Sequence, residues 1–210
     1  MHGKTDHRAD VGEILSQASC FIKESQYDRA IKELERGLAI EPDNRIFWEG
    51  VVVCNLGMKK PEKAIEALNH ILRIDPLAGQ IWGDKGYLHL LLNEKTEGIQ
   101  ALKESLRINP RNPRDWQLLA GAYVSEDEWE LALDCYERSL YLDPNSSTSW
   151  YNSAVCYFML GDYEAALVAV ENSISIDPSL EYLASEWIDI LRDDMIAPDL
   201  VTYSYDEPAS

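Results

Sequence analysis

Histidine is the first residue type to consider for chemistry, because its imidazole acts as a general base or a metal ligand near neutral pH. The chain has four: His2, His7, His70 and His89. They form no HExxH pair, and the sequence contains no nucleophile elbow, P-loop or other glycine-rich phosphate motif. We therefore expect surface or packing histidines and no catalytic residue.

Thiols and carboxylates do not build a reactive or metal-binding site either. The cysteines form no CxxC pair and lie inside apolar helical patterns, which predicts reduced, buried side chains: Cys20, Cys54, Cys135 and Cys156. The acidic run of residues 126–128 offers hard oxygen ligands. It lacks the glycine and the alternating spacing of a calcium-binding loop, so we interpret it as a solvated turn. The sequence predicts no metal and no cofactor.

Negative charge is concentrated in the second half of the chain. The 210 residues carry a net charge of −18, and the segment from Asp115 to the end holds 20 acidic and 2 basic residues. Without basic clusters, nucleic acid is an improbable ligand, and a neutral or basic partner is favoured. No apolar run approaches the roughly 20 residues of a membrane span, and the first residues are too polar for a signal peptide. We expect a cytoplasmic protein.

The elements that carry these residues repeat along the chain. Tryptophan recurs every 34 residues at Trp48, Trp82, Trp116 and Trp150, and proline recurs with the same period from Pro42 to Pro178. Five repeats follow without insertion: 11–44, 45–78, 79–112, 113–146 and 147–180. A period of this length is typical of stacked supersecondary units.

Each repeat has the pattern of two helices joined by a short turn. In the fifth repeat, apolar residues at i, i+4 and i+7 predict a first helix that ends near Gly161. Asp162 is a good N-cap for a second helix, which the Asp-Pro pair ends at Pro178. The eighth position is small in four repeats and the twentieth in all five, so we expect the two helix backbones to approach closely there.

This pattern resembles the tetratricopeptide repeat. The fifth repeat carries its features at Trp150, Ala154, Tyr157, Gly161, Tyr163, Ala166 and Pro178. The second repeat departs most, with Asn55 and Pro61 at two aromatic positions. The resemblance implies an all-α fold, a right-handed superhelical α-solenoid of five helix-turn-helix units. We expect a capping helix over 181–196, because the last repeat leaves an apolar face to cover. Residues 1–10 and the acidic tail 197–210 are expected to be disordered.

The resemblance also implies a partner-binding groove lined by the first helix of each repeat. Its second, fifth, sixth and ninth positions hold no lysine and only one arginine, Arg114, so a clamp for a partner's terminal carboxylates is not expected. The predicted groove is mostly apolar: Val53, Leu56, Tyr87, Leu90, Leu91, Gln117, Val124, Tyr151, Asn152, Val155, Phe158 and Met159. We predict a non-enzymatic scaffold or adaptor that binds a protein or peptide with an apolar stripe and basic flanks. The alternative is a platform that associates with itself through the groove or the terminal cap.

Overall fold

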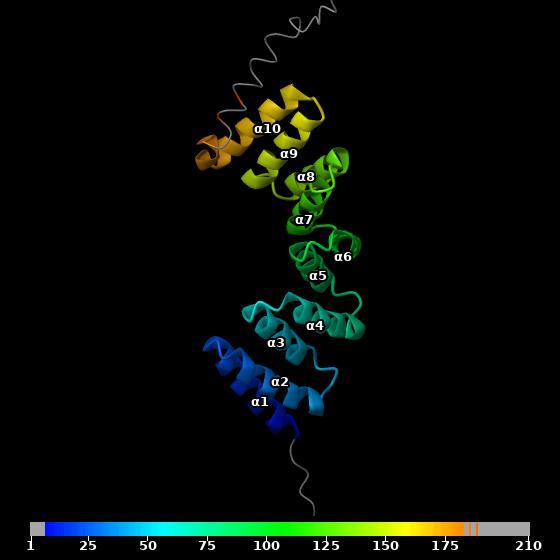
Figure 1. Cartoon of the computed structure of the whole chain (residues 1–210), viewed down its shortest axis with the longest axis vertical. Helices are drawn as coiled ribbons and strands as arrows, with labels where there is room; N and C mark the ends of the chain where they lie inside the picture. The colour runs from blue at the N-terminus through cyan, green and yellow to red at the C-terminus, as the bar shows by residue number, and fades with distance from the viewer. Residues whose placement is uncertain (1–6, 183–184, 186–187, 189–210) are drawn as a thin grey trace, which may run out of the picture. The chain divides into compact units, whose positions relative to one another are not determined.

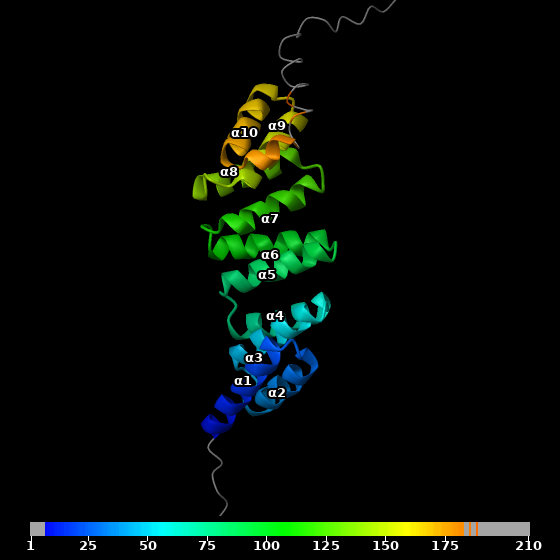
Figure 2. The same cartoon turned by 90° about the vertical axis from the view of Figure 1, so that its left-hand side faces the viewer.

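The computed structural model describes residues 7–182 together with 185 and 188, and these residues are helical apart from short connections. They form two compact blocks, which divide after Pro110. Each block is a series of antiparallel helix pairs, as Figures 1 and 2 show. The predicted all-α fold of helix-turn-helix units is confirmed.

The N-terminal block contains the first three repeats. In each of these repeats the first helix packs against the second, and within the block the second helices of the first two repeats pack against the first helix of the repeat that follows. The six helices are α1 His7–Lys23, α2 Tyr27–Ile40, α3 Arg45–Gly57, α4 Pro61–Ile74, α5 Gly79–Leu91 and α6 Lys95–Ile108.

The C-terminal block contains the fourth and fifth repeats, with the same order of helix contacts. Its elements are α7 Pro113–Val124, α8 Trp129–Leu142, α9 Ser147–Met159, α10 Tyr163–Ile176 and the short 3₁₀ helix η1 Pro178–Leu180. Asp162 caps α10 as predicted, because its side chain accepts from the Ala165 amide.

The tryptophan and the proline share one period because each tryptophan described below is hydrogen bonded to the proline six residues before it. The indole Nε1 of Trp48 donates to the carbonyl oxygen of Pro42 at 2.8 Å, and the same bond recurs in two other repeats. Trp82 donates to Pro76 and Trp150 to Pro144. Each of these three tryptophans therefore fixes the first helix of its repeat to the turn before it, and the bond satisfies the proline carbonyl, which lies outside a helix.

The turn inside each repeat needs one residue in the left-handed backbone region. That residue is glycine only in the fifth repeat, where Gly161 has φ of 80°. The other four repeats place Ser25, Lys59, Asn93 and Asp127 there, with φ between 57° and 61°. Asn and Asp tolerate this conformation better than Ser or Lys, so the turns at Ser25 and Lys59 carry backbone strain.

Small residues do allow close backbone approach, as predicted. Gly86 on α5 and Gly98 on α6 face each other, and a Cβ added to Gly98 would lie 3.2 Å from the Gly86 carbonyl oxygen. The helix pair of the third repeat has no room for a side chain at this crossing.

A second set of complementary positions joins one repeat to the next. The ring of Phe47 on α3 is fully buried and occupies the space above Gly37 on α2, where a Cβ would overlap it. The equivalent joint between α8 and α9 is polar, with the hydroxyl oxygens of Ser139 and Ser149 3.3 Å apart. The packing between repeats therefore differs from one joint to the next, although the helices repeat.

The two ends of the chain are only partly described. Helix α1 begins at His7, before the first predicted repeat, and residues 1–6 lie outside the described part. Most of the predicted capping helix over 181–196 and all of the tail 197–210 also lie outside it. Within it, Ile188 is buried in a cluster with Ala154, Ala169 and Val170 of the fifth repeat.

Candidate functional site

The first helices of the second and third repeats expose a row of large apolar side chains. Five side chains are each 41–61% exposed, and we call them the first-helix stripe: Ile46, Val53 and Leu56 on α3, and Tyr87 and Leu91 on α5. Val53 and Tyr87 hold the same position in consecutive repeats. Four of the five belong to the predicted groove. Ile46 does not, although it lies seven residues before Val53 and so shares its helix face.

Leu90, another predicted groove residue of this block, has a packing role. It is half-buried, and its side chain covers Gly98, where an added Cβ would lie 2.6 Å from Leu90 Cδ2. The glycine on α6 makes the space that Leu90 fills.

The predicted groove residues of the C-terminal block are less exposed. Met159 is half exposed. The others are half-buried: Gln117, Val124, Tyr151, Asn152, Val155 and Phe158. Tyr151 packs beside the buried cluster around Val170, and the Phe158 ring lies 5.6 Å from that of Tyr163. These aromatic side chains therefore contribute to the packing of the fifth repeat.

Two polar residues of the predicted groove, Gln117 and Asn152, form hydrogen bonds within the protein. Gln117 Nε2 donates to the hydroxyl oxygens of Ser146 and Ser149, at 2.9 and 2.8 Å. The Asn152 side chain is hydrogen bonded to the Tyr136 hydroxyl, while burial raises the pKa of Tyr136 above its ordinary value. Both amides support contacts between helices.

Two of the histidines, which the sequence offered as possible catalytic or metal-binding residues, make contacts that stabilise the fold. His70 stacks on the Trp48 ring at 3.8 Å, and burial and the Arg73 charge lower its pKa, so the imidazole is neutral at pH 7. His89 Nδ1 lies 2.6 Å from Glu94 Oε2. No group of three or more histidine, cysteine or acidic residues in the described part of the chain could hold a metal ion.

The cysteines match the packing prediction with one correction. Cys54, Cys135 and Cys156 are buried, and burial raises the pKa of Cys156 to about 11, which keeps its thiol protonated and unreactive. Cys20 is exposed, contrary to the prediction. It lies on α1, the first described helix, so no earlier repeat covers it.

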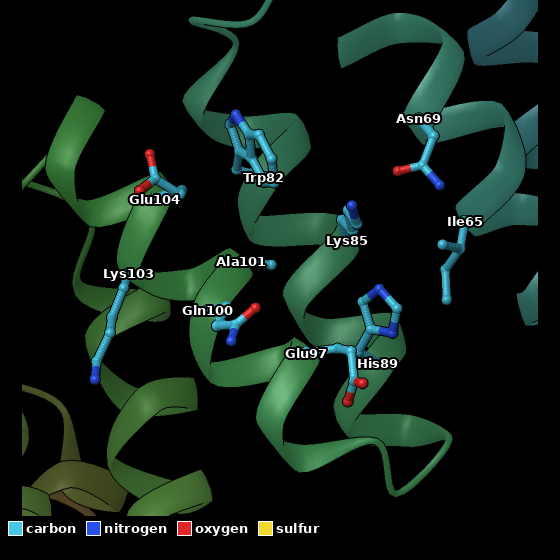
Figure 3. A pocket seen from close by; sticks show the side chains of 10 residues that line it. All are labelled: Ile65, Asn69, Trp82, Lys85, His89, Glu97, Gln100, Ala101, Lys103 and Glu104. Atoms are coloured by element: carbon cyan, nitrogen blue, oxygen red, sulfur yellow. The ribbon is translucent and has the colours of Figure 1, made fainter. Parts of the chain in front are cut away.

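The opposite face, formed by the second helices, has several clefts, and two of them have both the tryptophan and the eleventh residue of a repeat in their lining. One cleft of about 430 Å³ lies between α2 and α4 and has Trp48 and Asn55 of α3 in its lining. We call it the Asn55 cleft. The other, of about 560 Å³, lies between α4 and α6 over Trp82 and His89 of α5. Figure 3 shows the side chains of this His89 cleft. Trp48 and Trp82 are 34 residues apart, and so are Asn55 and His89, which hold the eleventh position of their repeats. The two clefts are therefore equivalent.

Three models of the tetratricopeptide repeat match the chain, at residues 21–83, 56–113 and 118–192. Together they cover α2 to α6 and α8 to α10 completely, most of α7 and the end of α1. The chain belongs to the tetratricopeptide repeat family.

Solved structures with the same tetratricopeptide fold are numerous. A crystal structure of MamA is 18% identical, with a TM-score of 0.72 over 77% of this chain and 95% of that one. MamA 41-end from Desulfovibrio magneticus is 14% identical, with a TM-score of 0.73 over 81% and 96%. YrrB, described as a TPR protein with an unusual peptide-binding site, is 17% identical, with a TM-score of 0.70 over 82% and 90%. At these identities the likeness concerns the fold.

No curated protein matches the chain in sequence. Among the described helices, none has both the length and the apolar character that crossing a membrane requires.

In the fifth tetratricopeptide repeat, Tyr157 fills the slot that Asn55 and His89 take in the second and third. Its hydroxyl donates to Glu137 Oε1 on α8 at 2.9 Å. Burial, followed by the hydrogen bond and charge of Glu137, raises the pKa of Tyr157 to about 12. The phenol thus bridges two helices in its neutral form.

We expect this phenol to contribute to alkaline unfolding. The unfolded chain loses the Tyr157 proton near pH 10 and the folded chain near pH 12, so stability from this group falls as pH rises through that window. Tyr157→Phe should remove this part of the pH dependence and cost about 1 kcal/mol at pH 7 through loss of the hydrogen bond. Urea unfolding at pH 7 and across pH 9–12 measures both. An identical alkaline profile in the variant would show that Tyr157 does not titrate in this way.

Proposed function

We propose that this protein is a non-enzymatic scaffold that binds a segment of a partner protein along the first-helix stripe. The observation that carries the proposal is the exposure of five large apolar side chains on α3 and α5. Apolar side chains gathered on one face usually mark an interaction surface in a soluble protein. Membership of the tetratricopeptide family supports the same class of function, because such arrays bind peptides or partner domains with their first helices.

The partner we propose is an amphipathic helix with basic residues beside its apolar face. The stripe has members seven and three residues apart on α3 and four apart on α5, so a partner helix with i, i+3/i+4 and i+7 anchors would complement it. The acidic excess after Asp115 would attract basic flanks and orient the partner during encounter. The half-buried groove residues of the C-terminal block remain predicted contacts, with Met159 the most accessible.

The structurally similar protein YrrB also supports the proposal. Its description names a peptide-binding site on a tetratricopeptide fold. A peptide is therefore a ligand that this architecture can take, and the apolar character of the stripe indicates which kind of peptide it would be here.

Site-specific photo-crosslinking in an extract of the native host tests the proposal. The full chain would carry a benzophenone amino acid in place of Leu91, and a control chain would carry it in place of Val168 on α10, which is 59% exposed against 61% for Leu91. We expect one partner protein to crosslink at Leu91 and not at Val168. Equal crosslinking at both positions would contradict the proposal. A crosslink from Leu91 to a second copy of the chain would favour self-association instead.

A further inference from the structure

The eleventh position of the repeats contributes to two of the clefts on the face of the second helices. This position is aromatic in three repeats, at Phe21, Tyr123 and Tyr157, and polar in two, at Asn55 and His89. The Asn55 cleft and the His89 cleft each lie at one of the two polar positions. A missing aromatic side chain therefore explains the space at both places.

The fifth repeat shows what this slot holds when it is filled. The Tyr157 ring occupies it, and the hydroxyl donates to Glu137. Glu137 is three repeats after Glu35, which lines the Asn55 cleft. The Asn55 cleft therefore has no tyrosine of its own in this slot, and it has a carboxylate at the position equivalent to Glu137.

The floor of the Asn55 cleft offers a second acceptor that lacks a donor. Asn55 is 3% exposed, and its Nδ2 donates to the Val51 carbonyl oxygen at 2.9 Å. Its Oδ1 has no hydrogen-bond partner in the described part of the chain. Buried acceptors are nearly always paired in folded proteins, so this oxygen calls for a donor from outside the chain.

The rest of the lining favours a neutral group with an apolar body. Trp48, Ile31 and Leu38 form apolar walls. The charged side chains around them have both signs: Asp28, Glu35, Lys60, Lys63 and Glu66. A ligand ion of either sign would meet like charges there, whereas a phenol matches apolar walls and one buried acceptor.

We propose that the Asn55 cleft binds the side chain of a tyrosine presented by a partner protein. The ring lies against Trp48 and the aliphatic walls, in the slot that Tyr157 fills in the fifth repeat, and the hydroxyl donates to Asn55 Oδ1. The partner thus supplies the aromatic residue that the second repeat lacks. This site opens between the second helices α2 and α4, with Trp48 and Asn55 of α3 in its lining, and it contains no residue of the first-helix stripe.

The test uses the full-length chain with N-acetyl-tyrosinamide as probe and N-acetyl-phenylalaninamide as its matched control, observed by NMR at the Asn55 side-chain amide. We expect saturable binding of the tyrosine probe at millimolar concentration and at least tenfold weaker binding of the phenylalanine probe. Asn55→Tyr fills the slot from within, so it should raise the melting temperature and abolish the shifts of neighbouring resonances in α2 and α4.

Tyr157→Asn provides an independent test, because it should open an equivalent cleft between α8 and α10 that binds the tyrosine probe. This variant keeps the proposal falsifiable if Asn55→Tyr does not fold. The proposal is wrong if the wild-type chain binds neither probe, if it binds both equally, or if a folded Asn55→Tyr variant still binds the tyrosine probe as the wild type does.

Discussion

Glutamate at both Val53 and Leu91 is expected to weaken binding of the proposed partner by about 100-fold or more, while the chain stays folded. Both side chains are about half exposed in the free protein, so the substitutions cost little stability. In the complex, the two carboxylates would be buried against an apolar helix face, and removing unpaired charges from water costs several kcal/mol. The measurement is the dissociation constant of the crosslinked partner once it is purified.

A control variant with the same change of charge comes from the second helices. Leu131 on α8 and Val168 on α10 are 47% and 59% exposed, and glutamate at both adds two negative charges away from the stripe. We expect affinity within a few fold of the wild type. If this control weakens binding as strongly as the stripe variant, net charge and not the stripe controls the interaction.

The stripe is a cleaner target than the aromatic residues of the fifth repeat. Tyr151 and Phe158 belong to the predicted groove, but both are half-buried, and they contact the Val170 cluster and Tyr163. Truncating them would change folding and binding together, so a loss of affinity would have two explanations.

Phe47→Ala is expected to lower the free energy of unfolding by about 3–5 kcal/mol, the usual cost of deleting a large aromatic side chain from a well-packed core. The ring is fully buried at the joint between the first and second repeats and lies where a side chain at Gly37 would otherwise be. Removing it leaves a cavity that two rigid helices cannot close. Urea unfolding of the variant, followed by far-UV circular dichroism, measures the loss.

A size swap across the same joint checks the mechanism. Gly37→Leu alone should also destabilise, because the new side chain would overlap the Phe47 ring and overpacking typically costs about 1–3 kcal/mol. The double variant Gly37→Leu/Phe47→Ala should be more stable than the sum of the single effects predicts. Strict additivity would mean that these two residues do not share one space.

Much of the fold could be predicted because its main signals are local or periodic. The interval from Trp48 to Trp82 indicated the repeat length, and the prolines from Pro42 to Pro178 indicated the ends of the second helices. Gly86 and Gly98 were recognisable as a close crossing because their positions are small in nearly every repeat. Such features involve residues of a single repeat. They therefore recur in each of the five copies, and the recurrence makes them recognisable in the sequence.

The site was less predictable, because exposure depends on neighbours far away in the sequence. Gln117 and Leu91 both lie on first helices, yet Gln117 bonds to Ser146 and Ser149 at the start of α9, whereas Leu91 is 61% exposed. Cys20 has the same position in its repeat as Cys54 and Cys156, but only Cys20 is exposed, since no described repeat lies before it. A position within the repeat does not reveal which neighbour covers it.

The sequence by itself determined the repeat, its two helices, the family and the absence of a recognisable catalytic motif, because these follow from spacing along one chain. The tertiary structure alone decided how one repeat meets the next. It paired Phe47 with Gly37, left Asn55 Oδ1 buried without a donor among the described residues, and exposed the stripe on α3 and α5. The physical reason is that burial is a property of the space between helices. That space depends on the side chains of two or three repeats together. The pattern of residues within a single repeat does not show which side chains of the neighbouring repeats will fill it.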